Sequence, residues 1–213
     1  AVTQPLTDGD VERYRTLARE TAAAVEGVAR GAEMSDTERS LAAELHYELQ
    51  ARGIESPVVL VGGEDRLQRY RHFTPTDTEI DSYVVLTVVG ERHGLNAAVT
   101  RTVAFDSAPE WLDARYRDVS RVAATVAAAT RQAGADGGTA GDVFDAIQSA
   151  YDDLGYDSEW ENHHQGGALG YASREWVATP DHDARVRLPM AFGWNPTVKG
   201  AKIEDTILAT EDE

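Results

Sequence analysis

Cysteine is absent from this 213-residue sequence, and lysine is nearly absent. The lack of cysteine excludes disulfides, thiolate nucleophiles and zinc sites built on cysteine ligands. The sequence also lacks a run of about eighteen apolar residues and a charged segment followed by an apolar leader, so it predicts neither a membrane-spanning helix nor a signal peptide. We therefore expect a cytoplasmic protein that does not bind membranes.

The charge is strongly one-sided. Twenty Lys and Arg stand against 37 Asp and Glu, the net charge is −17, and the only lysines are Lys199 and Lys202. This composition resembles that of halophilic proteins, whose self-repulsion is screened at about 1 M salt, where the Debye length is roughly 3 Å. Nucleic-acid binding is disfavoured, because it relies on the neutralisation of phosphates by basic residues. The local basic cluster around Arg69 and Arg71 is too small to reverse that expectation.

A weak internal repeat divides the chain. Arg13-Tyr14-Arg15 recurs as Arg115-Tyr116-Arg117, and each copy continues as helix, short link, helix, glycine and apolar strand. The segment Ser35-Asp36-Thr37-Glu38 offers an N-cap for the second helix of the first copy. Apolar residues recur at helical spacing in both copies, at Val11, Tyr14, Leu17, Val25, Val28, Leu41, Leu45, Leu49, Val119, Val122, Val126, Val143, Ile147, Tyr151 and Leu154.

Runs rich in β-branched residues predict the strands. They are Pro57–Val61, Tyr83–Val89, Asn96–Phe105, Arg185–Leu188 and Glu204–Thr210. Two αα-ββ halves related by a pseudo-twofold axis predict an α+β fold, in which a curved and mostly antiparallel sheet is backed by helices. We expect a single domain over residues 8–210, with residues 1–7 and 211–213 as tails.

Four short segments carry the most specific signal. They are Thr100-Arg101-Thr102, the stretch from His163-His164-Gln165-Gly166-Gly167 to Arg174-Glu175, Phe192-Gly193-Trp194-Asn195-Pro196, and Lys202-Ile203-Glu204-Asp205. In order and spacing they resemble the motifs D-x-T-R-T, H-x-x-G-H-G-I-G-x-x-x-H-E, F-x-x-E-P and R-x-E-D of the creatinase/aminopeptidase superfamily. That family includes Xaa-Pro aminopeptidases, prolidases, methionine aminopeptidases and creatinase, and the resemblance implies its pita-bread fold.

The resemblance also implies that most ligands of the family's two divalent metals are replaced. Four ligand positions correspond to Thr87, Ala98, Gly167 and Asn195, and only the last one keeps its carboxylate, as Glu204. Metal sites need three or four protein ligands. We therefore expect no metal and no cofactor.

The remaining carboxylate needs a partner if it is buried. Arg174 stands where the family has a histidine, and it could pair with Glu204; Arg101 or Lys202 could do the same. The alternative is that Arg174 points into solvent and Glu204 is half exposed. Trp194, beside the replaced ligand at Asn195, could fill the volume of the metals.

Histidines persist at matching positions. His72 and His163 match site histidines of the family, and Glu175 matches the glutamate of its H-E pair. The resemblance to creatinase, which needs no metal, gives His72 a role as general acid and base. The two glutamates that assist this histidine in creatinase correspond here to Thr100 and Asn195. If His163 and His164 lie on a strand, their side chains point to opposite faces, so the pair does not indicate a chelating motif.

These observations favour a metal-free pseudo-peptidase. Its pocket would bind a peptide terminus or a small amino or guanidino compound, and it is expected to include His72, Thr87, Ala98, Arg101, His163, Gly167, Arg174, Glu175, Asn195 and Glu204. The alternative is a C–N hydrolase, either creatinase-like with His72 and His163 as catalytic residues or an Xaa-Pro peptidase. A homodimer is expected from the prolidase and creatinase branch of the family.

Overall fold

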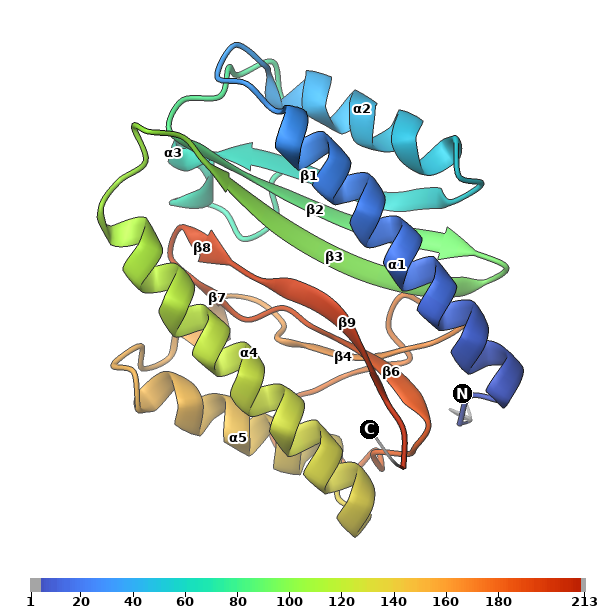
Figure 1. Cartoon of the computed structure of the whole chain (residues 1–213). Helices are drawn as coiled ribbons and strands as arrows, with labels where there is room; N and C mark the ends of the chain where they lie inside the picture. Colours follow the sequence, from blue (N-terminus) through green and yellow to red (C-terminus); the bar gives the residue numbers. More distant parts are fainter. Residues whose placement is uncertain (1–4, 212–213) are drawn as a thin grey trace.

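The computed structural model describes residues 5–211 and shows two halves that share one sheet (Figure 1). The first half contains α1 (Asp8–Gly31), α2 (Glu38–Gln50), β1 (Glu55–Gly63), α3 (Glu64–Leu67), β2 (Tyr83–Arg92) and β3 (Leu95–Ala104). The second half begins with α4 (Trp111–Asp136), α5 (Ala140–Asp152) and the short 3-10 helix η1 (Glu159–Asn162). Its strands are β4 (Gly166–Leu169), β5 (Trp176–Val177), β6 (Met190–Trp194), β7 (Thr197–Val198), β8 (Ala201–Lys202) and β9 (Glu204–Ala209).

The main sheet has seven strands in the order β1-β2-β3-β9-β6-β4-β5, and every neighbouring pair is antiparallel. The halves meet where β3 pairs with β9, through Val99 with Asp205 and Thr100 with Glu204. Helix α1 crosses β2 and β3, whereas α4 and α5 pack together beside the strands of the second half (Figure 1). The α+β fold and its mostly antiparallel sheet are therefore confirmed, and Glu204 lies at the seam.

Threonine side chains start three of the long helices. Thr7, Thr37 and Thr139 each accept a hydrogen bond from the backbone N–H three residues on, and the residue at that position returns a bond to the cap backbone. Such a capping box satisfies two of the N–H groups that a helix start leaves free. The predicted cap before the second helix is confirmed at Thr37. Most residues of the predicted apolar faces are buried in the core, and Val11 and Leu154 are partly buried.

Strand β2 is buried on both faces. Val84, Leu86 and Val88 belong to the apolar cluster under α1 and α2, whereas Tyr83 and Val85 belong to the cluster under α4 and α5. Because side chains alternate along a strand, Thr87 and Val89 share the face of Tyr83 and Val85. This face carries the site described below.

One predicted strand is wrong. Residues 185–188 form no strand; Arg185 makes only an isolated bridge to Thr139. The nearby backbone bonds explain this difference, because Val186 N–H donates to the Gly138 carbonyl and Gly141 N–H to the His182 carbonyl. The alternating Arg-Val-Arg-Leu pattern thus pairs with the start of α5, and β6 begins at Met190 instead.

The ends of the chain differ slightly from expectation. Leu6, expected in a tail, is buried and donates its N–H to the Pro189 carbonyl over 2.8 Å. Packing therefore begins two residues before the predicted domain start. Residues 1–4 and 212–213 lie outside the described part of the chain. Within residues 5–211, no helix has both the length and the apolar character that a bilayer crossing requires.

Candidate functional site

A small cavity opens on the sheet face that carries Thr87 and Val89. Its volume is about 170 Å³. Strands β1 and β2 supply a mainly apolar wall. The charged and polar groups come from the connection before β2, from β8 and the start of β9, and from connections of the second half. The lining residues are Val58, Leu60, His72, Thr87, Val89, His164, Ser173, Arg174, Asn195, Lys202 and Glu204.

The cavity brings together half of the residues expected from the sequence. His72, Thr87, Arg174, Asn195 and Glu204 line it. The other expected residues, Ala98, Arg101, His163, Gly167 and Glu175, are not among its lining residues. The cavity therefore shares five residues with the predicted pocket and adds Lys202 and His164, whereas Arg101 and Glu175 lie outside its lining.

Glu204 is the centre of the charged group. Its side chain is only 3% exposed, and its Oε1 lies 2.8 Å from Arg174 Nη2. Lys202 Nζ lies 3.9 Å from Oε2 of the same carboxylate. The predicted pairing of Arg174 with Glu204 is confirmed, and Lys202 adds a second, more distant cation. Arg101 instead pairs with Glu26 and Asp205.

Two threonines extend this group along the sheet. Thr100 donates its hydroxyl to Glu204 Oε2 over 3.3 Å, and the Thr87 and Thr100 hydroxyl oxygens lie 2.9 Å apart. Lys202 is 3% exposed. Burial lowers the pKa of the Lys202 ammonium, whereas the charge of Glu204 raises it and that of Arg174 lowers it further. The buried carboxylate of Glu204 thus lies between the guanidinium of Arg174 and the amine of Lys202.

The residues at the family's metal-ligand positions do not fit a pair of metals. A Cβ on Gly167 would lie 2.1 Å from the Trp176 carbonyl oxygen, so no histidine side chain fits there without a shift of the backbone. Ala98 is fully buried and has no donor atom for a metal. Among residues 5–211, no group of three or more His, Cys, Asp or Glu side chains could hold a metal ion.

Three histidines gather beside the cavity. The ring centroid of His72 lies 6.2 Å from that of His163 and 5.7 Å from that of His164. The centroids of His163 and His164 are 5.9 Å apart. His163 and His164 precede β4 and do not lie on a strand, so the condition for opposite faces is not met. His164 lines the cavity and His163 does not.

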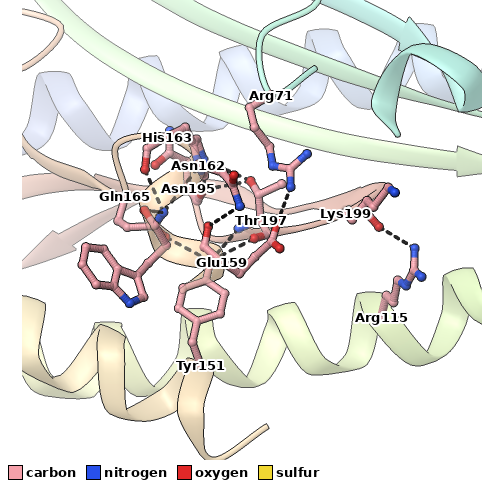
Figure 2. Close-up of polar contacts among 11 residues, drawn as sticks. Arg71, Arg115, Tyr151, Glu159, Asn162, His163, Gln165, Asn195, Thr197 and Lys199 are labelled. Atoms are coloured by element: carbon pink, nitrogen blue, oxygen red, sulfur yellow. Dashed lines mark hydrogen bonds and ion pairs between the residues drawn. The ribbon is translucent and has the colours of Figure 1, made fainter. Parts of the chain in front are cut away.

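The ring nitrogens of His163 are held by the protein (Figure 2). Nε2 lies 3.1 Å from the Asn195 carbonyl oxygen, and Nδ1 lies 3.3 Å from Gln165 Nε2. Gln165 Oε1 in turn accepts from the Tyr151 hydroxyl. Burial lowers the pKa of His163 to about 3, so the ring is neutral near pH 7. This network fixes the connection before β4 and leaves His163 without a free nitrogen for proton transfer.

The other two histidines are freer. Loss of surrounding water lowers the pKa of His72, and it lowers that of His164 to about 4 with help from the charge of Arg174. His164 is exposed, so water screens part of this effect. In the part of the chain that the structure describes, no hydrogen bond joins His72 to Glu175 or Glu204. Glu175 accepts instead from the Tyr171 N–H.

Trp194 does not occupy the cavity. Its ring stacks on Phe192 with an interplanar angle of 3° and lies 6.2 Å from the ring of Trp176. These rings belong to the apolar cluster under α4 and α5. The opposite face of β6 presents Gly193, where an added Cβ would lie 3.3 Å from Arg174 Nη1. The small residue, not the tryptophan, determines the space beside Arg174.

Some lining residues escaped the sequence analysis. From the sequence, Val58, Leu60 and Val89 indicate only strands. The pattern His163-His164 indicates no site if the pair lies on a strand, so it does not predict that His164 lines the cavity. Lys202 was considered only as a partner for Glu204. Its position in the K-x-E-D segment, in a chain with two lysines, was the available signal.

Comparison with solved structures identifies the fold class. A prolidase from Pyrococcus furiosus superimposes with a TM-score of 0.83 at 21% identity, over 96% of this chain and 62% of that chain. An X-Pro aminopeptidase from Thermotoga maritima gives 0.84 at 17% identity, over 97% and 60%. A methionine aminopeptidase from Rickettsia prowazekii gives 0.72 at 14% identity, over 99% and 97%. This chain therefore spans about three fifths of the prolidase and X-Pro aminopeptidase chains.

The sequence comparison agrees. The model of metallopeptidase family M24 matches residues 12–211, so this chain belongs to metallopeptidase family M24. No curated protein matches the sequence. The expected membership of the creatinase/aminopeptidase superfamily is confirmed.

Proposed function

We propose that this M24-family domain has lost the dimetal site and works as a metal-free pseudo-peptidase whose cavity binds a small molecule or a peptide end. The observation that carries the proposal is the ion pair between Arg174 and Glu204. The guanidinium of Arg174 pairs with Glu204, which stands at a position where the family has a metal-binding carboxylate. The guanidinium remains charged at every accessible pH. An intact dimetal site balances its carboxylates with dications; here one carboxylate is balanced by Arg174 and Lys202.

The hydrolase alternative has less support. A metal-dependent peptidase needs a metal-activated water, and Thr87, Ala98 and Gly167 offer no carboxylate or imidazole to hold the metal. A creatinase-like reaction needs a carboxylate to orient His72. Glu204 is engaged by Arg174, and Glu175 is directed at the Tyr171 backbone.

Metal stoichiometry tests the proposal. The protein is incubated in high salt with manganese, cobalt or zinc, desalted, and analysed for bound metal per chain. Because 37 acidic residues can hold divalent ions weakly, Glu204→Ala is compared with Glu44→Ala, which removes an exposed carboxylate from α2. We expect the same low metal content in the parent and both variants, and no cleavage of Xaa-Pro dipeptides. One or two equivalents that disappear only in Glu204→Ala would overturn the proposal.

A further inference from the structure

We propose that the ligand of this cavity is a small carboxylate, held by Arg174 and Lys202, and not an amine or a guanidine. This inference rests on the proposed function, since it assigns the ligand class of the metal-free cavity. It reverses the sequence-based expectation of an amino or guanidino compound.

The charges of the lining residues give the first argument. Both oxygens of Glu204 already face cations, with Arg174 on Oε1 and Lys202 on Oε2. A cationic ligand would therefore meet no free carboxylate in the cavity. An anionic ligand would meet two cations that share one internal carboxylate, and it would favour the charged form of Lys202.

Unused hydrogen-bonding groups give the second argument. Arg174 donates to the Ser173 carbonyl through Nη1 and to Glu204 through Nη2, while its buried Nε has no partner among the described residues. Lys202 is 3% exposed, and its single ion-pair distance of 3.9 Å exceeds hydrogen-bond length. Buried polar groups normally find partners, so these groups indicate a polar ligand.

The size and the apolar wall narrow the ligand further. The cavity measures about 170 Å³, and a cavity of about 150 Å³ accommodates benzene. Val58, Leu60 and Val89 form the apolar side. The fit is thus a carboxylate attached to a short branched or aliphatic group, the size of one C-terminal residue or a small carboxylic acid.

Three isosteric probes separate the ligand classes. Isobutyrate, isobutyramide and isobutyramidine share a carbon skeleton and carry negative, zero and positive charge. Binding to the full chain is measured by NMR titration at constant high ionic strength, with a chelator present. We expect isobutyrate to bind at least about tenfold more tightly than the amide, in keeping with the greater strength of charge-assisted hydrogen bonds, and the amidine not to bind.

Variants test the contributions of Lys202 and Glu204 to the binding. Lys202→Met should weaken isobutyrate binding, Glu204→Gln should strengthen it by removing the internal competitor, and Glu44→Ala should leave it unchanged. If Glu204→Gln fails to fold, Lys202→Met alone decides. Equal binding of the three probes, tighter binding of the amidine, or an unaltered affinity in Lys202→Met would overturn the inference. Metal bound by Glu204 in the stoichiometry experiment would overturn the proposed function instead.

Discussion

Two buried glutamates, one in each half of the molecule, are held in different ways. Glu38, at the start of α2, accepts hydrogen bonds from the Gly63 N–H, the Thr76 N–H and the Thr76 hydroxyl, and Arg66 lies 3.1 Å from it. Glu204, at the start of β9, accepts one hydroxyl bond of 3.3 Å and otherwise depends on Arg174 and Lys202. The side chain of each carboxylate is 3% exposed or less.

The difference separates a structural carboxylate from a site carboxylate. Glu38 joins α2 to the end of β1 and to the connection before β2, and three hydrogen bonds from neutral donors hold it besides Arg66. The charged partners of Glu204, Arg174 and Lys202, line a cavity together with it. The first half therefore uses its buried charge to fix the fold, and the second half keeps its buried charge next to an open space.

Removal of the arginine partner should expose this difference most strongly. Arg174→Ala leaves Glu204 with a distant lysine and one hydroxyl, so we expect the free energy of unfolding to fall by about 3–5 kcal/mol. Arg66→Ala leaves Glu38 with three hydrogen bonds, so we expect a loss of about 1–2 kcal/mol. Guanidinium-induced unfolding in high salt measures both values.

The exposed pair between Arg117 and Asp113 provides the control. Its side chains are 72% and 70% exposed, and Arg117→Ala should change the stability by no more than about 1 kcal/mol. If Arg66→Ala costs as much as Arg174→Ala, the two carboxylates are equivalent and the comparison fails.

Histidine gives a second contrast. The pKa of folded His163 is about 3, below the ordinary value of 6.5, so the unfolded chain binds a proton that the folded chain does not between these values. The stability from neutral His163 is therefore complete above about pH 6.5 and falls by about 1.4 kcal/mol per pH unit as the pH drops toward 3. Unfolding measured from pH 7 to 4 tests this slope.

His163→Gln should remove that slope contribution, because glutamine does not titrate. Parallel curves for the parent and His163→Gln would mean that the ring is protonated in the folded protein. The network of Gln165 and Tyr151 around His163 would then need a different account.

The sequence predicts the first half better than the second for a physical reason. The strands of the first half are long and β-branched, and the predicted Pro57–Val61, Tyr83–Val89 and Asn96–Phe105 overlap β1, β2 and β3. In the second half, β4 and β6 are short and contain glycine and alanine. Local propensity is weak there, and the pairing of Gly167 with Gly193 decides the structure.

The residues of the site also differ in how well the sequence predicts them. The pairing of Arg174 with Glu204 was predictable, because a buried carboxylate requires a partner and few cations are near it in the sequence motifs. The positions of His164 and Trp194 were not, since both depend on where β4 and β6 begin and end. A shift of one residue in a strand moves a side chain to the other face.

The smallest contrast concerns two helical glycines. Gly27 of α1 has nothing within 4 Å of an added Cβ, so Gly27→Ala should raise the free energy of unfolding by about 0.5–1 kcal/mol through helix propensity alone. At Gly134 of α4 an added Cβ would lie 2.8 Å from Leu188 Cγ, in the segment that follows α5 rather than in the sheet. Leu188 must move to make room. The cost of this movement should offset the gain in helix propensity, so Gly134→Ala should show no net stabilisation. Thermal unfolding of both variants in the same salt gives the comparison. Equal stabilisation by both substitutions would mean that the segment around Leu188 yields freely, and that the irregular connections of the second half are less tightly packed than the regular elements of the first.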